Sequence, residues 1–573
     1  RVESNLGTHA FFVDGAQGGA VGIGVTPEVW SSTADFLQVG AAASFWGTTN
    51  NSVAIMQANA YFNASNAYKY INTDQATQYI QVDGTHKWSS VVSGSADADI
   101  TFVESLQIDA SGNVIIANTG GTLQTATAAG DASNLRLGSN AGNSIAAVGG
   151  TAAGTYNVLL GNEAGTSLTT GYRNVFVGAF AGDAVDTGHN NVAIGLNALT
   201  LENAGFNNIA IGSAALNVQN GGQDNIAIGF NALTSNLTGD SNVAVGHSAG
   251  TFATTAANST FVGRFAGQGI TGTKLTGNDN TAVGTNSGLL LQGAATQNTF
   301  VGKGSGQAVT VGVKNTLLGS RSGDALINAD SNVAIGESAL SSDTYGDGSV
   351  AIGDSALYAQ NFTSAATSFN TAVGYASGNS TTTGQSNVFV GYASGQFNST
   401  GFANTFVGSA AGTGVTGAKL TGSANTAIGQ GAGNDLQGGA GDNVFLGANA
   451  GGQVTTGSYN ILIGHDAGTH DSPITTGANN IIIGSFADHP SGAGSEDAII
   501  MGYNVTGVGA DNFTFGRGTT DSNIEFGATS ITAPSDQRYK EDIADATAGL
   551  AFIKDLRPVT FKWKKEKDVP SDH

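Results

Sequence analysis

Near the C-terminal end of the chain, a serine and a lysine lie close enough in sequence to act together on a peptide bond. The segment SDQRYK places Ser535 and Asp536 side by side, with Lys540 five positions after the serine. A serine hydroxyl is a weak nucleophile that needs a base, and a lysine serves once burial lowers the pKa of its ammonium group. The same residues also fit an ordinary role, in which Ser535 caps a turn and Lys540 is a solvated helix charge. Spacing alone leaves both interpretations open.

The residues that follow this pair predict a helix and then a strand. The helix spans about 545–556, with Asp545 as its N-cap and Pro558 ending it. A strand is expected next, because apolar side chains alternate there with Thr560 and Lys562. We therefore expect a small α+β unit. Its apolar residues are Leu550, Ile553 and Leu556 on the helix and Val559, Phe561 and Trp563 on the strand.

This segment resembles the start of the intramolecular chaperone domain of phage endosialidase tailspikes and L-shaped tail fibres. In that family the domain trimerises, guides folding of a preceding β-shaft and cuts itself off at a Ser-Asp junction. The resemblance implies cleavage between Ser535 and Asp536, with Ser535 and Lys540 as the catalytic dyad of a serine autoprotease that acts at most once per chain. The matching residues are Ser535, Asp536, Arg538, Lys540, Ile543 and the stretch LRPVTFKW.

The resemblance covers only residues 535–573, whereas the family's domain is considerably longer. The chain also begins at Arg1 rather than at a methionine. We therefore expect further sequence beyond both ends, with the chaperone domain truncated at His573.

Charge and composition argue against several classes of protein. The formal net charge is −22, while residues 535–573 are neutral, so the whole excess lies in residues 1–534. With no basic stripe, neither nucleic-acid binding nor docking on an anionic membrane is expected. The absence of cysteine excludes disulfides and thiolate zinc sites. We find no signal peptide and no apolar run of about 18 residues that could span a bilayer.

From residue 157 onward one short pattern recurs along the chain. It reads Asn, three apolar residues, Gly, two variable residues, and Ala-Gly or Ala-Leu, as in NVAIGLNAL at 191. The strand-ending glycine returns twenty times from Gly161 to Gly502, and twelve of the nineteen intervals are 17 residues. Intervals of 18, 20 or 21 residues are interpreted as small loop insertions. An array of fixed period predicts a β-solenoid of stacked coils. The position four before the glycine is Asn except at Ser259, Ser349 and Ala498.

A longer duplication is superimposed on the short repeat. The segment GITGTKLTGNDNTAVG at 269 matches GVTGAKLTGSANTAIG at 414, 145 residues later. Because the array grew by copying, most of it is expected to be scaffold. Stacked asparagines are expected to form a ladder of amide hydrogen bonds, and the glycines to permit positive φ at the turns.

The three apolar positions of each repeat predict a strand without a wet face. Its middle residue is Ala, Phe, Leu or Ile, its third is Ile, Val or Leu, and its first is Val, Ile or Thr. A strand with one solvated face should instead alternate apolar and polar residues. One face is expected inside the coil and the other against equivalent strands of further subunits. A single-chain solenoid that buries only its own interior is the alternative.

The repeat resembles the heads of YadA-like trimeric autotransporter adhesins, whose shorter repeats carry a SVAIG-type strand on a left-handed β-roll. Similar NTAVG-type arrays occur in phage tail fibres. Together the resemblances imply an all-β, elongated homotrimeric β-solenoid or β-roll shaft with a small α+β C-terminal chaperone segment. The expected domains are an N-terminal β-rich domain at 1–150, the shaft at 151–534 and the start of the chaperone at 535–573.

The N-terminal region is rich in aromatic residues and turns, which predicts a separate β-domain. A buried core is the favoured interpretation of these aromatic residues, and stacking on sugar rings is the alternative. They are Trp30, Trp46, Trp88, Tyr61, Phe62, Tyr68, Tyr70 and Tyr79.

Two polar segments resemble metal sites, but we favour polar loops for both, so neither a metal nor a cofactor is expected. One is a calcium-roll-like stretch at 431–443, which has no counterpart in the duplicated copy; the other is HDAGTHD at 465–471. Acidic residues are otherwise scattered in variable turns, without the carboxylate pair that glycan cleavage requires. The residues concerned are Asp435 and Asp442, and His465, Asp466, His470 and Asp471.

These inferences combine into one expected function, a structural phage tail fibre located in the virion tail. Its expected partners are two further copies of the chain, a host-surface glycan or protein receptor and other virion tail proteins. A tailspike polysaccharide depolymerase and a bacterial trimeric adhesin are the alternatives.

Overall fold

The computed structural model divides the chain into two compact units, Arg1–Ala244 and Val245–His573. Every regular element among the described residues is a β-strand, which confirms the predicted all-β fold. Within those residues there is consequently no helix of the length and apolarity needed to cross a membrane. The expected helix at 545–556 lies outside them. The structure describes residues 2–3, 9–14, 20–23, 34–40, 43–48, 53–63, 65, 67–111, 114–115, 134–145, 154–490, 494 and 496–528.

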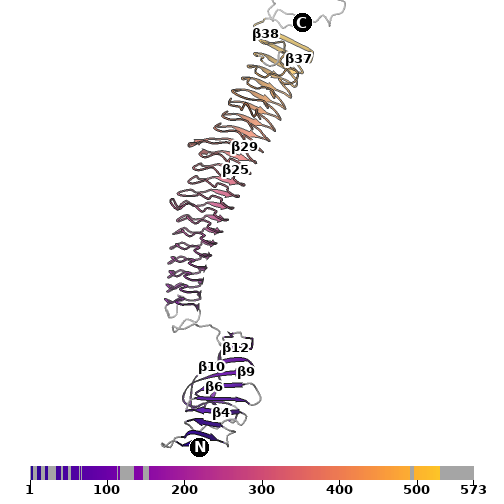
Figure 1. The fold of residues 1–573 in the computed structure, drawn as a ribbon. Coiled ribbons are helices and arrows are strands. Elements are labelled where there is room, and N and C mark those ends of the chain that lie inside the picture. Colours follow the sequence, from indigo (N-terminus) through magenta and orange to yellow (C-terminus); the bar gives the residue numbers. More distant parts are fainter. Residues whose placement is uncertain are drawn as a thin grey trace, which may run out of the picture. The chain divides into compact units, whose positions relative to one another are not determined.

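The first unit begins with a ten-stranded sheet in the order β1-β2-β3-β4-β5-β6-β9-β10-β12-β13 (Figure 1). Neighbouring strands in it are antiparallel, except that β3 and β4 are parallel. A smaller sheet has the order β11-β8-β7. The strands are β1 (Val2–Glu3), β2 (His9–Asp14), β3 (Ala20–Ile23), β4 (Ala34–Val39), β5 (Ala43–Thr48), β6 (Val53–Ala58), β7 (Ala60–Phe62), β8 (Tyr68–Tyr70), β9 (Asp74–Val82), β10 (Thr85–Gly94), β11 (Asp99–Ile100), β12 (Val103–Ile108) and β13 (Val114–Ile115).

One face of the larger sheet carries the N-terminal core. Trp46, Ile55 and Tyr61 are buried there, and the ring of Phe62 stacks on Trp46 with centroids 5.0 Å apart. The indole N–H of Trp46 donates to the side-chain oxygen of Gln57 at 3.1 Å, so this buried polar group is satisfied. These contacts give the N-terminal sheets an aromatic core, and the predicted domain boundary at residue 150 stays a prediction.

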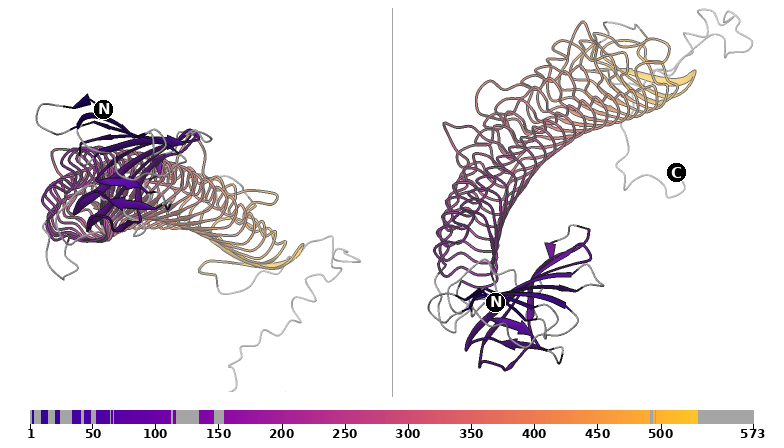
Figure 2. Two further views of the ribbon diagram at one scale, coloured as in Figure 1. Left: turned by 90° about the horizontal axis from the view of Figure 1, so that it is seen from below. Right: turned by 60° about the horizontal axis from the view of Figure 1, so that its bottom comes forward.

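The remaining strands form parallel ladders in which each coil of chain contributes one strand (Figures 1 and 2). Pairing is in register, as between Val175–Val177 and Val192–Ile194, where each residue faces its equivalent one repeat later. Parallel strands need a crossover, and the rest of each coil supplies it. The predicted β-solenoid of about 17-residue repeats is therefore confirmed. In the first unit its strands are β14 (Leu135–Leu137), β15 (Val158–Leu160), β16 (Val175–Val177), β17 (Val192–Ile194), β18 (Ile209–Ile211) and β19 (Ile226–Ile228), with β20 (Val243–Val245) at the unit boundary.

In the second unit the same ladder continues to an antiparallel hairpin of β37 and β38. Insertions leave the ladder undisturbed, because Thr260 pairs with Thr281 although 21 residues separate them. A short pair, β26 and β28, joins two of the loops. The strands are β21 (Thr260–Val262), β22 (Thr281–Val283), β23 (Thr299–Val301), β24 (Thr316–Leu318), β25 (Val333–Ile335), β26 (Gly346–Asp347), β27 (Val350–Ile352), β28 (Ala366–Thr367), β29 (Thr371–Val373), β30 (Val388–Val390), β31 (Thr405–Val407), β32 (Thr426–Ile428), β33 (Val444–Leu446), β34 (Ile461–Ile463), β35 (Ile481–Ile483), β36 (Ile499–Tyr503), β37 (Asn512–Arg517) and β38 (Thr520–Glu525).

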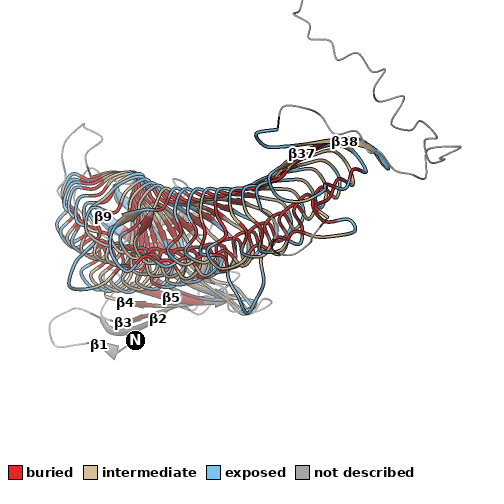
Figure 3. Cartoon of the chain, turned by 90° about the horizontal axis from the view of Figure 1, so that it is seen from above, coloured by how far each residue is buried: buried red, intermediate tan, exposed pale blue. Residues whose placement is uncertain are grey.

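The middle residue of each ladder strand fills the inside of its coil. Phe176, Ala193 and Leu317 are fully buried, and Figure 3 shows buried positions recurring at the same place in successive coils. The glycine that ends the strand is needed for two reasons. Gly195 has a φ of +136°, and a Cβ on it would lie 2.6 Å from the carbonyl oxygen of Gly212 in the next coil. Only hydrogen fits there, so coils stack at backbone distance.

The predicted asparagine ladder is present, and it joins side chain to backbone. Asn174 Oδ1 accepts the backbone N–H of Asn191 at 2.9 Å, and Asn174 Nδ2 donates to the Gly188 carbonyl at 2.9 Å. Each asparagine thus holds two backbone groups of the following coil. Where serine replaces it, Ser259 Oγ still accepts the backbone N–H of Asn280 at 3.2 Å. At Ala498 the ladder ends, because alanine has no side-chain acceptor to continue it.

Two ionisable side chains are buried near the end of the ladder. The Asp488 carboxylate accepts hydrogen bonds from the backbone N–H groups of His470, Asp471 and Ser472. Burial nevertheless raises the pKa of Asp488, because desolvation outweighs those hydrogen bonds. Burial also lowers the pKa of the neighbouring His489, so its imidazole is neutral in the fold.

Replacing one ladder asparagine tests whether these side chains hold the coils together. In Asn225→Ala, the N–H of Asn242 and the carbonyl of Gly239 each lose a buried partner. We expect a loss of about 1–3 kcal/mol in the free energy of unfolding, measured by urea denaturation. Asn220→Ala is the control, because Asn220 is exposed and lies outside the ladder. Equal effects of the two substitutions would contradict the assigned role.

Because burial lowers the pKa of His489, we expect the stability of the fold to depend on pH. A histidine whose pKa is lower in the folded state contributes stability that is present above about pH 6.5 and lost as pH falls below it. The raised pKa of Asp488 has the opposite effect on stability. Its contribution is present below the unfolded pKa of 3.8 and is lost as the pH rises above that value. We expect the melting temperature to fall from about pH 7.5 to 5.5, and less so in His489→Gln. The control His247→Gln, at an exposed histidine, should keep the wild-type slope; an unchanged slope in His489→Gln would refute the assignment.

Candidate functional site

The outer face of the ladder is the candidate assembly surface. Each strand turns its first and third residues to this face, and in-register pairing aligns the third residues as an apolar column beside a column of Val, Ile and Thr. In the second unit Leu318 is 44% exposed, Ile352 36% and Leu446 45%. A contiguous apolar strip of this kind marks an interaction surface in a soluble protein. The prediction of strands that are apolar on both faces is therefore confirmed.

Exposed aromatic rings stack at single positions of successive coils. Tyr375 and Tyr392, each directly after a strand-ending glycine, lie 5.7 Å apart with ring planes 9° from parallel. In the first unit His189 is sandwiched between Tyr172 and Phe206 at 4.7 and 5.0 Å. The coil spacing of a parallel ladder, about 4.8 Å, brings equivalent rings to stacking distance. These columns are therefore a consequence of the repeat.

Two buried acidic residues correct the expectation that carboxylates lie in variable turns. Glu202 and Asp343 are fully buried inside their coils. Asp343 Oδ1 accepts the N–H groups of Gly346 and Phe362 at 3.2 and 3.0 Å, and its Oδ2 accepts Gln360 Nε2 at 2.6 Å. Glu202 Oε1 accepts the backbone N–H groups of Ala204, Gly205 and Gly221, whereas its Oε2 is buried without a hydrogen-bond partner. These two carboxylates stabilise turns and do not line a groove.

The sequence contains a pattern that could have predicted the burial of Glu202 and Asp343. Each acid stands seven positions after its strand-ending glycine, Gly195 or Gly336, where Leu326 stands in another coil. A glutamine, Gln219 or Gln360, occupies that same position one coil after each acid. Comparison by position in the coil would have separated these interior acids from those of the loops.

Three residues from the two polar segments considered as metal sites lie close together in the second unit. Asp435, Asp466 and His470 line a hollow of about 380 Å³, whereas Asp442 and Asp471 do not. The carboxylates are engaged, since Asn434 donates to Asp435 and Asn449 to Asp466, both at 3.0 Å. Among the described residues no three His, Asp or Glu side chains are gathered as metal ligands.

The N-terminal aromatic residues divide between a core to which both sheets contribute and the opposite face of the larger sheet. Trp46, Tyr61 and Tyr70 are buried, and burial raises the pKa of Tyr68. Trp88 is 37% exposed and lies 5.0 Å from the ring of Tyr79 on the other face. The core interpretation thus holds for the first group and not for the second. Trp30 lies outside the described residues.

The predicted catalytic residues Ser535, Asp536 and Lys540 lie outside the described residues. Their dyad therefore stays a prediction from the sequence.

Comparison with known proteins bears on this terminal segment. A protein-family model described as Peptidase_S74, chaperone of endosialidase, matches residues 535–573. No curated protein and no solved structure matches the chain. A chaperone-of-endosialidase domain is therefore present at the C-terminus, preceded by a β-solenoid, the combination found in a fibre or tailspike type of protein.

Proposed function

We propose that this chain is the shaft of a homotrimeric phage tail fibre, folded on a C-terminal intramolecular chaperone. The observation that carries the proposal is the succession of a long apolar-faced β-solenoid and residues 535–573 that match the chaperone of endosialidase. In the virion tail, such a shaft connects other tail proteins to a receptor on the host surface, either a glycan or a protein.

Three-fold association follows from the outer apolar strip. Three equivalent columns of Val, Ile and Leu side chains around one axis bury each other along the whole strand ladder. Each fully buried aliphatic side chain contributes about 1.5–3 kcal/mol relative to an exposed one. Each coil offers one or two such side chains per chain, because the first strand residue is threonine in some coils, and the gain is summed over all the coils. A closed cyclic assembly also leaves no copy of the strip exposed.

The terminal segment is proposed to cut itself off after folding is complete. Ser535 and Lys540 act as nucleophile and base on the Ser535–Asp536 bond. The net reaction consumes one water and leaves a carboxylate on Ser535 and an amine on Asp536. Removing the template makes unfolding of the remaining shaft irreversible, because the shaft can no longer refold from its nucleus.

Charges placed on the outer strip test the trimer. In Leu318→Lys/Ile352→Lys, three symmetry-related pairs of ammonium groups would meet at the axis, and desolvation costs several kcal/mol per ion. We expect native mass spectrometry to give trimers for wild type and at least a tenfold weaker association for the variant. Tyr358→Lys, at an exposed apolar residue outside the strip, should remain trimeric. A wild-type chain that stays monomeric would overturn the proposal.

Autoprocessing is tested by intact mass. Expressed with its whole chaperone domain, the wild-type chain should shorten to a product ending at Ser535. Ser535→Ala should abolish cleavage, with a rate loss of about 10³-fold or more, while trimers still form. Ser571→Ala, at a serine outside the proposed dyad, is the matched control. Cleavage that persists in Ser535→Ala would remove Ser535 as the nucleophile.

A further inference from the structure

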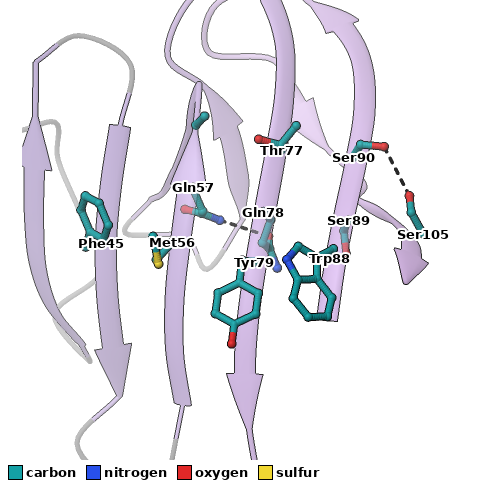
Figure 4. A pocket seen from close by; sticks show the side chains of 11 residues that line it. Phe45, Met56, Gln57, Thr77, Gln78, Tyr79, Trp88, Ser89, Ser90 and Ser105 are labelled. Carbon is teal, nitrogen blue, oxygen red and sulfur yellow. Dashed lines mark hydrogen bonds between the residues drawn. The ribbon is translucent and has the colours of Figure 1, made fainter. Parts of the chain in front are cut away.

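The exposed face of the N-terminal sheet carries a row of large side chains from four adjacent strands (Figure 4). Register pairs Phe45 with Met56, Met56 with Tyr79, and Tyr79 with Trp88. Directly opposed residues of neighbouring strands point to the same side of a sheet. The four side chains therefore form one continuous wall. The opposite face of these strands already carries the core, so the fold does not require this wall.

Small residues beside the wall leave a hollow of about 500 Å³. Its floor is the next cross-strand row, in which Ala58 pairs with Thr77 and Thr77 with Ser90. Ser90 Oγ and Ser105 Oγ approach to 3.5 Å, and both residues are exposed. The volume lies within the range of small-molecule sites, about 300–1,000 Å³, and the lining combines aromatic faces with a few hydroxyl groups.

The chemistry of the lining selects the ligand class. A pyranose ring has C–H faces that pack on aromatic rings and edge hydroxyls that both donate and accept hydrogen bonds. The hydroxyl groups of Thr77, Ser90 and Ser105 likewise both donate and accept hydrogen bonds. No charged residue lines the hollow, and the chain carries a net charge of −22, which disfavours polyanionic glycans.

An apolar protein partner fits this surface less well than a saccharide does. Covering Thr77, Ser90 and Ser105 with an apolar face would bury their hydroxyls without partners, at about 1–3 kcal/mol each. A ligand rich in hydroxyls satisfies them. The rings are also held in place beforehand, since Tyr79 hydrogen-bonds His86 through its hydroxyl and packs 5.0 Å from Trp88. Little side-chain freedom then remains to be lost on binding.

We propose that this hollow binds a neutral oligosaccharide, with Trp88 and Tyr79 as the stacking platform and Thr77, Ser90 and Ser105 as the polar contacts. The inference deepens the receptor recognition in the proposed function and rests on it for its biological role. The site itself lies within one N-terminal sheet and needs neither trimer nor chaperone. Failure of glycan binding would thus leave the trimeric shaft untouched, and failure to trimerise would leave this site in place.

Direct binding to the full chain tests the proposal. A panel of neutral oligosaccharides built from glucose, galactose, mannose and N-acetylglucosamine is compared with sialylated and sulfated ones. The best neutral ligand is then titrated by calorimetry. We expect saturable binding, at least tenfold weaker in Trp88→Ala, with Trp88→Phe retaining most of the affinity because it keeps a ring face. Met56→Ala, at an exposed residue between Phe45 and Tyr79 in the wall, should weaken binding without disturbing the sheet.

Tyr375→Ala is the matched control, since Tyr375 is an exposed stacked aromatic residue in the other unit. Circular dichroism shows that each variant is folded. The proposal is overturned if no neutral glycan binds, if only anionic glycans bind, or if folded Trp88→Ala and Met56→Ala both bind like wild type. Self-association of the chain that Trp88→Ala abolishes and no neutral glycan inhibits would also overturn it, because a second copy would then be the occupant.

Discussion

The structure depends on stacking each coil directly on the next at the distance of one backbone hydrogen bond. Two residues of the repeat make that distance possible. The strand-ending glycine leaves room for a carbonyl 2.6 Å from where its Cβ would be, as at Gly195, and the buried asparagine holds two backbone groups of the following coil. Each hydrogen bond adds only about 1 kcal/mol, but every coil repeats the arrangement.

Once stacking is fixed, the strand ladder determines what the rest of the coil does. Its middle residue faces inward and is buried, whereas its first and third residues form the outer strip. Insertions at Leu275 and Leu420 are accommodated beside the ladder, where each bridges to neighbouring coils. Surface columns such as Tyr375 and Tyr392 become aligned by the same spacing. Assembly surface, loop variation and aromatic stacks thus share one geometric origin.

The same regularity makes the correct register of the coils hard to find during folding. We propose that the C-terminal chaperone serves as the template that sets it. Coils of nearly equal sequence pair almost as well one repeat out of register, and in the proposed trimer three chains would have to adopt the same register. Parallel pairing between separated coils is also slow and leaves edges exposed meanwhile. In the proposed trimer, the C-terminal chaperone would fix the nearest coils in common register, so that stacking proceeds from there. In the described residues the N-terminal sheet has its own core and does not pair with the strand ladder. It is the part of the chain in which we propose glycan binding.

The amino-acid sequence by itself determined the period, the all-β class, the asparagine ladder, the insertions and the apolar outer face, because a repeat displays its packing positions many times over. The chaperone segment was likewise recognisable from SDQRYK and LRPVTFKW. The sequence pattern did not reveal the first coil, β14, where Arg136 replaces the apolar middle residue, or the buried Glu202 and Asp343, which substitute for apolar residues. Only tertiary structure separated Phe45 and Trp88 from Trp46 and Tyr61. Phe45, Trp46 and Trp88 belong to one sheet, in which strand register decides the face that each side chain occupies, whereas Tyr61 reaches the shared core from the smaller sheet.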